Sequence, residues 1–192
     1  MTHIHELKPR HRPRRTKRVR PVGAVALVAF VLVLVAFAFL GQTKALADTT
    51  SLKNKPAPVF ELPDMEGKLI SLRDLKEVVL LDFFTTTCPN CDELAPHVQG
   101  LYEEYAEKGL KVFGVSMGDP PSRLRTYVAD KKLTYPVLIG TSAVARAYQI
   151  PGVPVVVIID RGGIVRHVQI GFRNGLGLEA AMERVIRELL GL

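Results

Sequence analysis

Only two cysteines, Cys88 and Cys91, occur in the chain of 192 residues, and Pro89 and Asn90 separate them. The pair follows an apolar run, residues 78–84, and precedes a segment whose apolar side chains recur at helical spacing. At a helix N-terminus the free backbone N–H groups and the helix dipole stabilise a thiolate, the reactive form of Cys. A second thiol one turn along can close a reversible disulfide with the first. The pair is therefore predicted to be a redox-active dithiol; a static disulfide and half of a zinc site are the alternatives.

The elements that would position this pair alternate between strand and helix. Residues 78–84 (VVLLDFF) form a near-continuous apolar run, which predicts a central strand covered on both faces. Apolar periodicity predicts the other strands at 111–116, 135–139, 155–160 and 164–170, and the helices at 92–108, 122–132, 143–148 and 177–190. Residues 161–163 (RGG) suit a hairpin turn. This order predicts an α/β fold, a mixed sheet with helices on both faces.

Charge is distributed unevenly along the chain. Eight of the 26 Lys and Arg, but only one of the 19 Asp and Glu, lie within the first 20 residues, which leaves 18 of each sign in the remainder. A domain that binds nucleic acid carries its basic surface on the folded part, whereas here the excess belongs to a tail. We therefore expect no nucleic-acid partner.

Residues 22–40, which follow the basic tail, contain no charged or polar side chain. A helix of this length covers about 30 Å, the thickness of the hydrocarbon core of a bilayer. The sequence predicts a basic cytoplasmic tail over 1–21, a transmembrane helix over 22–40, a spacer over 41–54 and a folded domain over 55–192. By the positive-inside rule this domain lies outside the cytoplasm. Cleavage after Ala47, in Ala45-Leu46-Ala47, is the alternative and would release a soluble domain.

Three segments, in this order, resemble the membrane-anchored TlpA/ResA group of thiol-disulfide oxidoreductases, AhpC/TSA-redoxin-like members of the thioredoxin superfamily. They are 57–62 (APVFEL) with the Asp64, Gly67-Lys68 and Ser71-Leu72 that follow, the strand with Cys88-x-x-Cys91, and 152–160 (GVPVVVIID) followed by Gly162-Gly163. The resemblance implies a thioredoxin-like fold with a cis-Pro154 facing the Cys pair, and no cofactor beyond the disulfide of that pair. A trans-Pro154 at the start of an edge strand is the alternative.

The resemblance also implies roles for individual residues. Cys88 would attack the disulfide of a partner, and Cys91 would resolve the mixed disulfide. The residues that would receive the substrate chain are Val153, Pro154, Pro89, Asn90 and Asp119. The implied partners are exported Cys-containing proteins, apocytochrome c among them, and a membrane thiol electron carrier.

Two acidic residues are candidates for supporting roles. Asp82 lies on the predicted central strand, six residues before Cys88. A buried carboxylate is costly, and a raised pKa would suit it to take the proton of Cys91. Exposure near the strand end is the alternative. Asp119 matches by position an acidic residue that ResA-like proteins place near the Cys pair; the alternative is a cap on the helix that follows.

Two departures from the group bear on the direction of the reaction. Thr87 stands where the group usually has Trp, and Pro89 comes first in the dipeptide between the cysteines. A reductant is expected, because a buried Asp82 disfavours a very stable Cys88 thiolate. Pro89 and the Val before Pro154 also occur in oxidising members of the superfamily, so a disulfide-forming oxidant is the alternative.

Two other functions share parts of this pattern. A thiol peroxidase of the peroxiredoxin type has a Thr three residues before its Cys, as Thr85 is here, but Leu81 stands where that type has Pro. A copper-binding assembly chaperone would use the Cys pair with a distant His such as His167, but that group separates its cysteines by three residues. No metal site is therefore expected.

Overall fold

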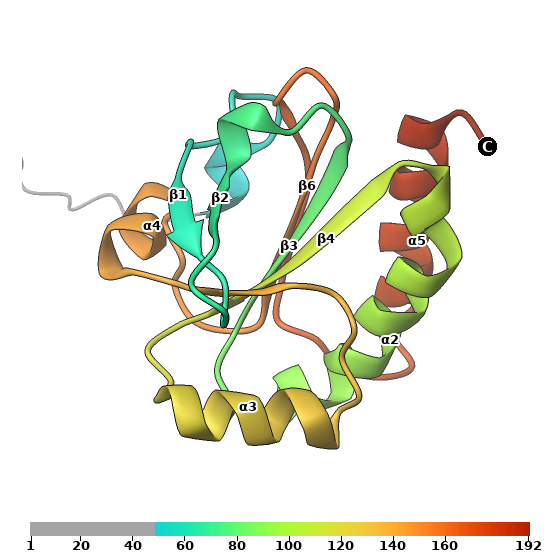
Figure 1. Cartoon of the computed structure of the whole chain (residues 1–192). Coiled ribbons are helices and arrows are strands. Elements are labelled where there is room, and N and C mark those ends of the chain that lie inside the picture. Colours follow the sequence, from blue (N-terminus) through green and yellow to red (C-terminus); the bar gives the residue numbers. More distant parts are fainter. Residues whose placement is uncertain (1–48) are drawn as a thin grey trace, which may run out of the picture. The chain divides into compact units, whose positions relative to one another are not determined.

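The computed structural model describes residues 49–192 of the chain (Figure 1). The predicted basic tail, the predicted transmembrane helix over 22–40 and the Ala47 cleavage site lie outside the described residues. Within 49–192, no helix has both the length and the apolar character needed to cross a membrane.

A five-stranded sheet forms the centre of the fold, in the order β5-β4-β3-β6-β7. Its strands are β3 (Val78–Phe84), β4 (Leu110–Ser116), β5 (Val137–Ile139), β6 (Val155–Ile159) and β7 (Val165–Ile170). β3, β4 and β5 are parallel, whereas β6 is antiparallel to both β3 and β7. The predicted mixed sheet is therefore confirmed. Every residue of β3 is buried, as its apolar run predicts for a central strand.

Helices cover both faces of this sheet (Figure 1). Side chains of α2 (Pro89–Tyr105), α3 (Pro121–Asp130) and α5 (Leu178–Leu190) share one core cluster with Leu80 and Phe84 of β3. The other cluster joins Leu81 and Phe83 of β3 to α4 (Ser142–Ala147) and to the small hairpin of β1 (Glu61–Pro63) and β2 (Leu69–Ser71). Successive side chains of a strand point to opposite faces, so β3 contributes to both clusters.

The helix after the Cys pair begins three residues earlier than its apolar pattern predicts, at Pro89 rather than at 92. Pro suits the first helical position, because the N–H that it lacks would have no partner there. The regular helix ends at Tyr105, and one 3₁₀ turn, Ala106–Lys108, leads to Gly109 at φ 103°. Glycine adopts this left-handed conformation readily, which explains why the chain turns there into β4.

The folded part of the chain begins before the predicted boundary at residue 55. Thr49–Leu52 forms a short 3₁₀ turn, and Leu52 is buried in the core cluster that contains Val165. The Asn54 N–H donates to the Val165 carbonyl oxygen at 2.7 Å, which fastens this segment to β7. The predicted spacer is polar in composition, but its Leu52 side chain is buried in the core. Residues 49–54 therefore belong to the folded part.

Candidate active site

Cys88 and Cys91 form a disulfide at the N-terminus of α2. Cys88 is the N-cap residue and is partly exposed, whereas Cys91 lies in the first turn with 2% of its surface exposed. The Cys91 N–H donates to Cys88 Sγ at 3.2 Å. A donor at this place stabilises a Cys88 thiolate after reduction, as does the helix dipole. Cys88 is thus the sulfur that a partner protein can reach, and Cys91 is the one beneath it.

The Val153–Pro154 peptide bond is cis, as the resemblance implies. The Val153 carbonyl oxygen lies 3.7 Å from Cys88 Sγ, and Pro154 is buried. The strand that follows, β6, lies between β3 and β7 in the sheet. The alternative of a trans-Pro at an edge strand is therefore wrong. The structure brings this backbone, 65 residues away in sequence, into contact with the reactive sulfur.

Asp82 is buried in the middle of β3, with 4% of its surface exposed. By the alternation of the strand its side chain lies on the face of Leu80 and Phe84, which is the face that α2 and Cys91 cover. Its Oδ1 atom has no hydrogen-bond partner within residues 49–192. Burial raises the pKa of Asp82 from its ordinary value to about 7. The alternative of an exposed carboxylate near the strand end is wrong, and Asp82 can exchange a proton near neutral pH.

Asp119 does not cap the helix that follows it. The N-cap residue of α3 is Pro120, and no side chain in the described part of the chain caps that helix. Instead, the Asp119 carboxylate accepts the Thr86 N–H at 3.0 and 3.1 Å, the Thr86 hydroxyl at 2.6 Å and the Ser116 hydroxyl at 2.8 Å. These bonds fasten the loop that leads into Cys88 to the end of β4. The capping alternative is therefore wrong.

Thr86 and Ser116 are site residues that the sequence reasoning missed. Each stands at the carboxyl end of a strand, after β3 and at the end of β4. Because the two strands are parallel and adjacent, their carboxyl ends meet at one edge of the sheet. This topology is the signal that could have associated both residues with Asp119.

The remaining predicted residues lie near the pair or apart from it. Pro89 and Asn90, between the two cysteines, are exposed. His167 lies on β7 in register with Ile158. Among the described residues, no group of three or more His, Cys, Asp or Glu is placed to hold a metal ion.

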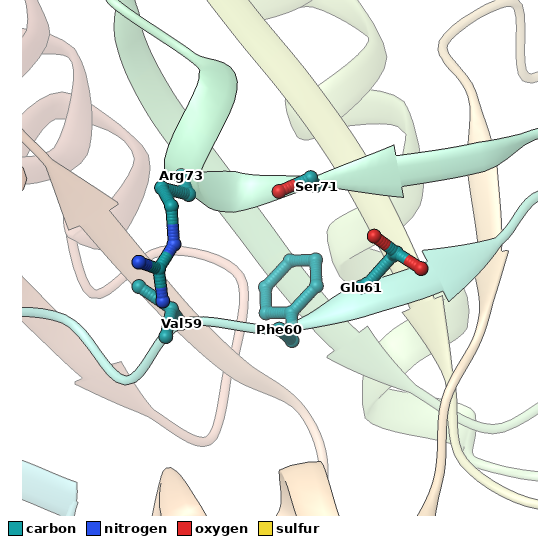
Figure 2. Close-up of a pocket in the computed structure, with 5 residues that line it drawn as sticks. All are labelled: Val59, Phe60, Glu61, Ser71 and Arg73. Atoms are coloured by element: carbon teal, nitrogen blue, oxygen red, sulfur yellow. The ribbon is translucent and has the colours of Figure 1, made fainter.

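A separate pocket lies on the β1–β2 hairpin and is lined by Val59, Phe60, Glu61, Ser71 and Arg73 (Figure 2). Figure 2 shows the Arg73 side chain extending toward Val59 at one side of this group of residues. None of these residues belongs to the Cys site. The reactive disulfide instead lies at the partly exposed N-terminus of α2, where another protein chain can approach it.

The sheet order, the disulfide at the start of the helix after the central strand and the cis-Pro beside it define a class, the thioredoxin-fold proteins with a redox-active dithiol. A thiol:disulfide interchange protein of the thioredoxin family from Chlorobium tepidum has the same fold, with a TM-score of 0.63 and 27% identity. The match covers 72% of this chain and 98% of that chain.

Residues 54–168 match the model of the AhpC/TSA family, and the chain belongs to this family. It is 30% identical over 172 residues to the thiol-disulfide oxidoreductase ResA of Halalkalibacterium halodurans, a match that covers 88% of this chain and 97% of the relative. It is 32% identical over 134 residues to ResA of Bacillus cereus, with 68% and 77% covered. The chain is a thiol-disulfide oxidoreductase of the TlpA/ResA type.

Proposed function

We propose that the protein reduces disulfide bonds in exported Cys-containing proteins. The observation that carries this proposal is the asymmetry of the pair, with Cys88 partly exposed at the N-terminus of α2 and Cys91 buried beneath it. An exposed, stabilised thiolate suits the attacking sulfur, and a shielded thiol suits the resolving one. Apocytochrome c is the substrate that the TlpA/ResA resemblance favours.

The reaction begins with the pair in the dithiol form. The Cys88 thiolate attacks one sulfur of the substrate disulfide, forms a mixed disulfide and releases the other substrate sulfur as a thiolate. The Val153 carbonyl oxygen and Pro154 lie where the incoming chain would pass Cys88. Pro89 and Asn90, both exposed, directly follow the partly exposed Cys88.

Resolution requires the Cys91 thiol to lose its proton. Asp82 takes this proton, because its side chain lies on the face of β3 that α2 covers and its pKa of about 7 lets it act as a base near neutral pH. The Cys91 thiolate then attacks Cys88 Sγ, and the second substrate thiolate leaves. Two electrons have passed to the substrate, and the Cys88–Cys91 disulfide remains. A membrane thiol electron carrier returns the pair to the dithiol.

The direction follows from the same buried carboxylate. A negative charge on Asp82 below the pair disfavours a second negative charge on the sulfurs. Asp82 thus offsets part of the stabilisation that the helix N-terminus gives the Cys88 thiolate. A thiolate less stable than that of an oxidising member makes the disulfide harder to reduce, which is the property of a reductant.

The proposed location depends on residues 1–40. The basic tail over 1–21 stays in the cytoplasm, the apolar run over 22–40 spans the membrane, and the Cys domain lies outside. Cleavage after Ala47 is the alternative, and it would leave the same domain in the same compartment.

Trapping of mixed disulfides tests the proposal. Cys91→Ser removes the thiol that resolves the mixed disulfide at Cys88. The full-length variant, expressed in its own cells, should therefore accumulate disulfide-linked partners, and thiol reductants should release them. Cys88→Ser is the matched control and should accumulate none. Partners trapped by Cys88→Ser alone would reverse the two roles, and partners trapped by neither variant would contradict the proposed function.

A further inference from the structure

The buried carboxyl of Asp82 has no charged partner in the part of the chain that the structure describes. None of the ion pairs among residues 49–192 includes Asp82, and its Oδ1 atom accepts no hydrogen bond. The proposed function requires this group to be ionised before it takes the proton of Cys91. Some neighbouring group must therefore stabilise the ionised carboxylate, because an unpaired charge in an apolar layer is costly.

The neighbour across the sheet is a glycine. Asp82 pairs with Gly114 of β4, and Gly114 lies on the same face as Val112 by two-residue alternation, so it opens space toward α2 and α3. A Cβ atom on Gly114 would stand 3.2 Å from Cε2 of Tyr135 and 3.0 Å from Cε1 of Phe84. The rings of Phe84 and Tyr135 thus border the place beside Asp82 that a side chain at position 114 would fill, and Tyr135 is the one of the two that carries a hydroxyl.

The Tyr135 hydroxyl is a second buried polar group in this layer. The Tyr135 side chain is buried, with 3% of its surface exposed, and its hydroxyl has no hydrogen-bond partner among the described residues. Burial and the negative charge of Asp82 raise the pKa of Tyr135 well above its ordinary value, so this hydroxyl keeps its proton and can donate a hydrogen bond. Buried polar groups are seldom left unpaired, and here two of them lie in one layer.

The other ionisable groups of this layer cannot serve as the donor that Asp82 lacks. On α3, the Tyr127 hydroxyl is already hydrogen-bonded to Asp92, and this bond, burial and the charges of Asp92, Asp82 and Asp119 all raise the pKa of Tyr127. Asp92 on α2 is paired with Lys131 at 3.3 Å. Asp119 is held by Thr86 and Ser116.

We propose that Tyr135 is a positioning residue for the proton transfer, and that its hydroxyl donates a hydrogen bond to the Asp82 carboxylate when Cys91 is to be deprotonated. The proton that moves is that of Cys91, which passes to Asp82; Tyr135 keeps its own. The inference rests on the proposed role of Asp82. Its consequence is that Tyr135 sets the pH at which Asp82 becomes a base.

The test is the pH dependence of insulin reduction by the full-length chain, compared with Tyr135→Phe. A hydrogen bond to a charged group is worth enough to move a pKa by about one unit or more. The rising limb of the variant should therefore move up by about one pH unit, with the rate about tenfold lower at pH 6 and close to the original at pH 9. Carbon-13 titration of the Asp82 carboxyl in the oxidised protein should show the same shift.

Two further variants make the outcome decisive. Tyr148, which is equally buried, belongs to the other core cluster, and its hydroxyl donates to the Pro58 carbonyl oxygen. Tyr148→Phe should therefore leave the pH profile unchanged. In an Asp82→Asn background, Tyr135→Phe should produce no further shift. If Asp82→Asn moves the profile and Tyr135→Phe does not, the inference about Tyr135 is wrong. If Asp82→Asn leaves the pH profile of insulin reduction unchanged, the proposed role of Asp82 is wrong instead. If the unmodified chain does not reduce insulin at all, the proposed function is contradicted.

Discussion

Thr86 and Asp119 lie 33 residues apart in sequence, and three of the four hydrogen bonds of the Asp119 carboxylate come from Thr86. Thr86 stands two residues before Cys88, at the point where the chain leaves β3 for α2. The remaining bond comes from Ser116, the last residue of β4. The approach to the reactive sulfur is therefore fixed by the neighbouring strand.

Asp119→Ala should weaken both stability and catalysis, because it leaves the Thr86 N–H and two hydroxyls without their acceptor. We expect the free energy of unfolding to fall by about 1 to 3 kcal/mol and kcat/KM for insulin reduction to fall by about tenfold. Urea unfolding of the oxidised protein and steady-state kinetics measure the two effects. Thr126→Val, which removes a hydroxyl bond to the Ser122 carbonyl oxygen within α3, is the control and should change neither by much. An unchanged rate in Asp119→Ala would show that the loop needs no such anchor.

Asp82 should make the oxidised protein less stable as the pH rises. Its pKa in the folded protein is raised to about 7, so the folded state holds the proton more tightly than the unfolded state does. The contribution of Asp82 to the free energy of unfolding is fully favourable below pH 4 and is lost as the pH rises through about 7. The loss amounts to about 4 kcal/mol at most. Urea unfolding at pH 5 and pH 8 should show Asp82→Asn gaining stability relative to the original chain at the higher pH.

Asp160→Asn provides a control of opposite sign. Despite partial burial, hydrogen bonds from the Ile164 and Gly162 N–H groups and from Arg166 lower the pKa of Asp160. Asp160 therefore stabilises the folded state when the pH is above the ordinary pKa of an Asp, and this stabilisation is lost as the pH falls through its lowered pKa. Its replacement should cost stability at both pH 5 and pH 8. An Asp82→Asn variant that behaved like Asp160→Asn would refute the assignment of a buried, protonated acid.

The redox potential of the pair decides the direction of electron flow. Equilibration of the full-length chain with dithiothreitol and glutathione should give a value near that of thioredoxin, about −270 mV, as expected for a reductant. Alkylation of free thiols followed by mass measurement reports the oxidised fraction. A value above about −150 mV would make disulfide formation the task of the protein.

The membrane prediction depends on the apolar run over 22–40. The full-length chain should fractionate with membranes and resist extraction by high salt, and a membrane-impermeant thiol reagent should label Cys88 in intact, reduced cells. Ala47→Phe, which would block the alternative cleavage site, should leave this distribution unchanged. A soluble form that begins at Asp48 and disappears in Ala47→Phe would show that the run is a cleaved signal.

Much of the fold was predictable because it depends on local pattern. The run VVLLDFF predicts β3 at its observed bounds, and the alternation of strands and helices predicts the mixed sheet. The position of Cys88 and Cys91 at the start of a helix also follows from neighbouring residues alone. The cis bond before Pro154 followed from the family resemblance, and the structure shows it.

The rest was decided by contacts between residues distant in sequence. Strand pairing opposes Asp82 to Gly114, and the rings of Phe84 and Tyr135 border the space that the glycine leaves open. Thr86 meets Asp119 only because β3 and β4 end at the same edge of the sheet. A carboxyl pKa depends on the dielectric and the donors around it, and an isolated segment has neither until the sheet and its helices close over it. The sequence by itself determined which two sulfurs react, and the tertiary structure decided which buried groups can supply and receive their protons.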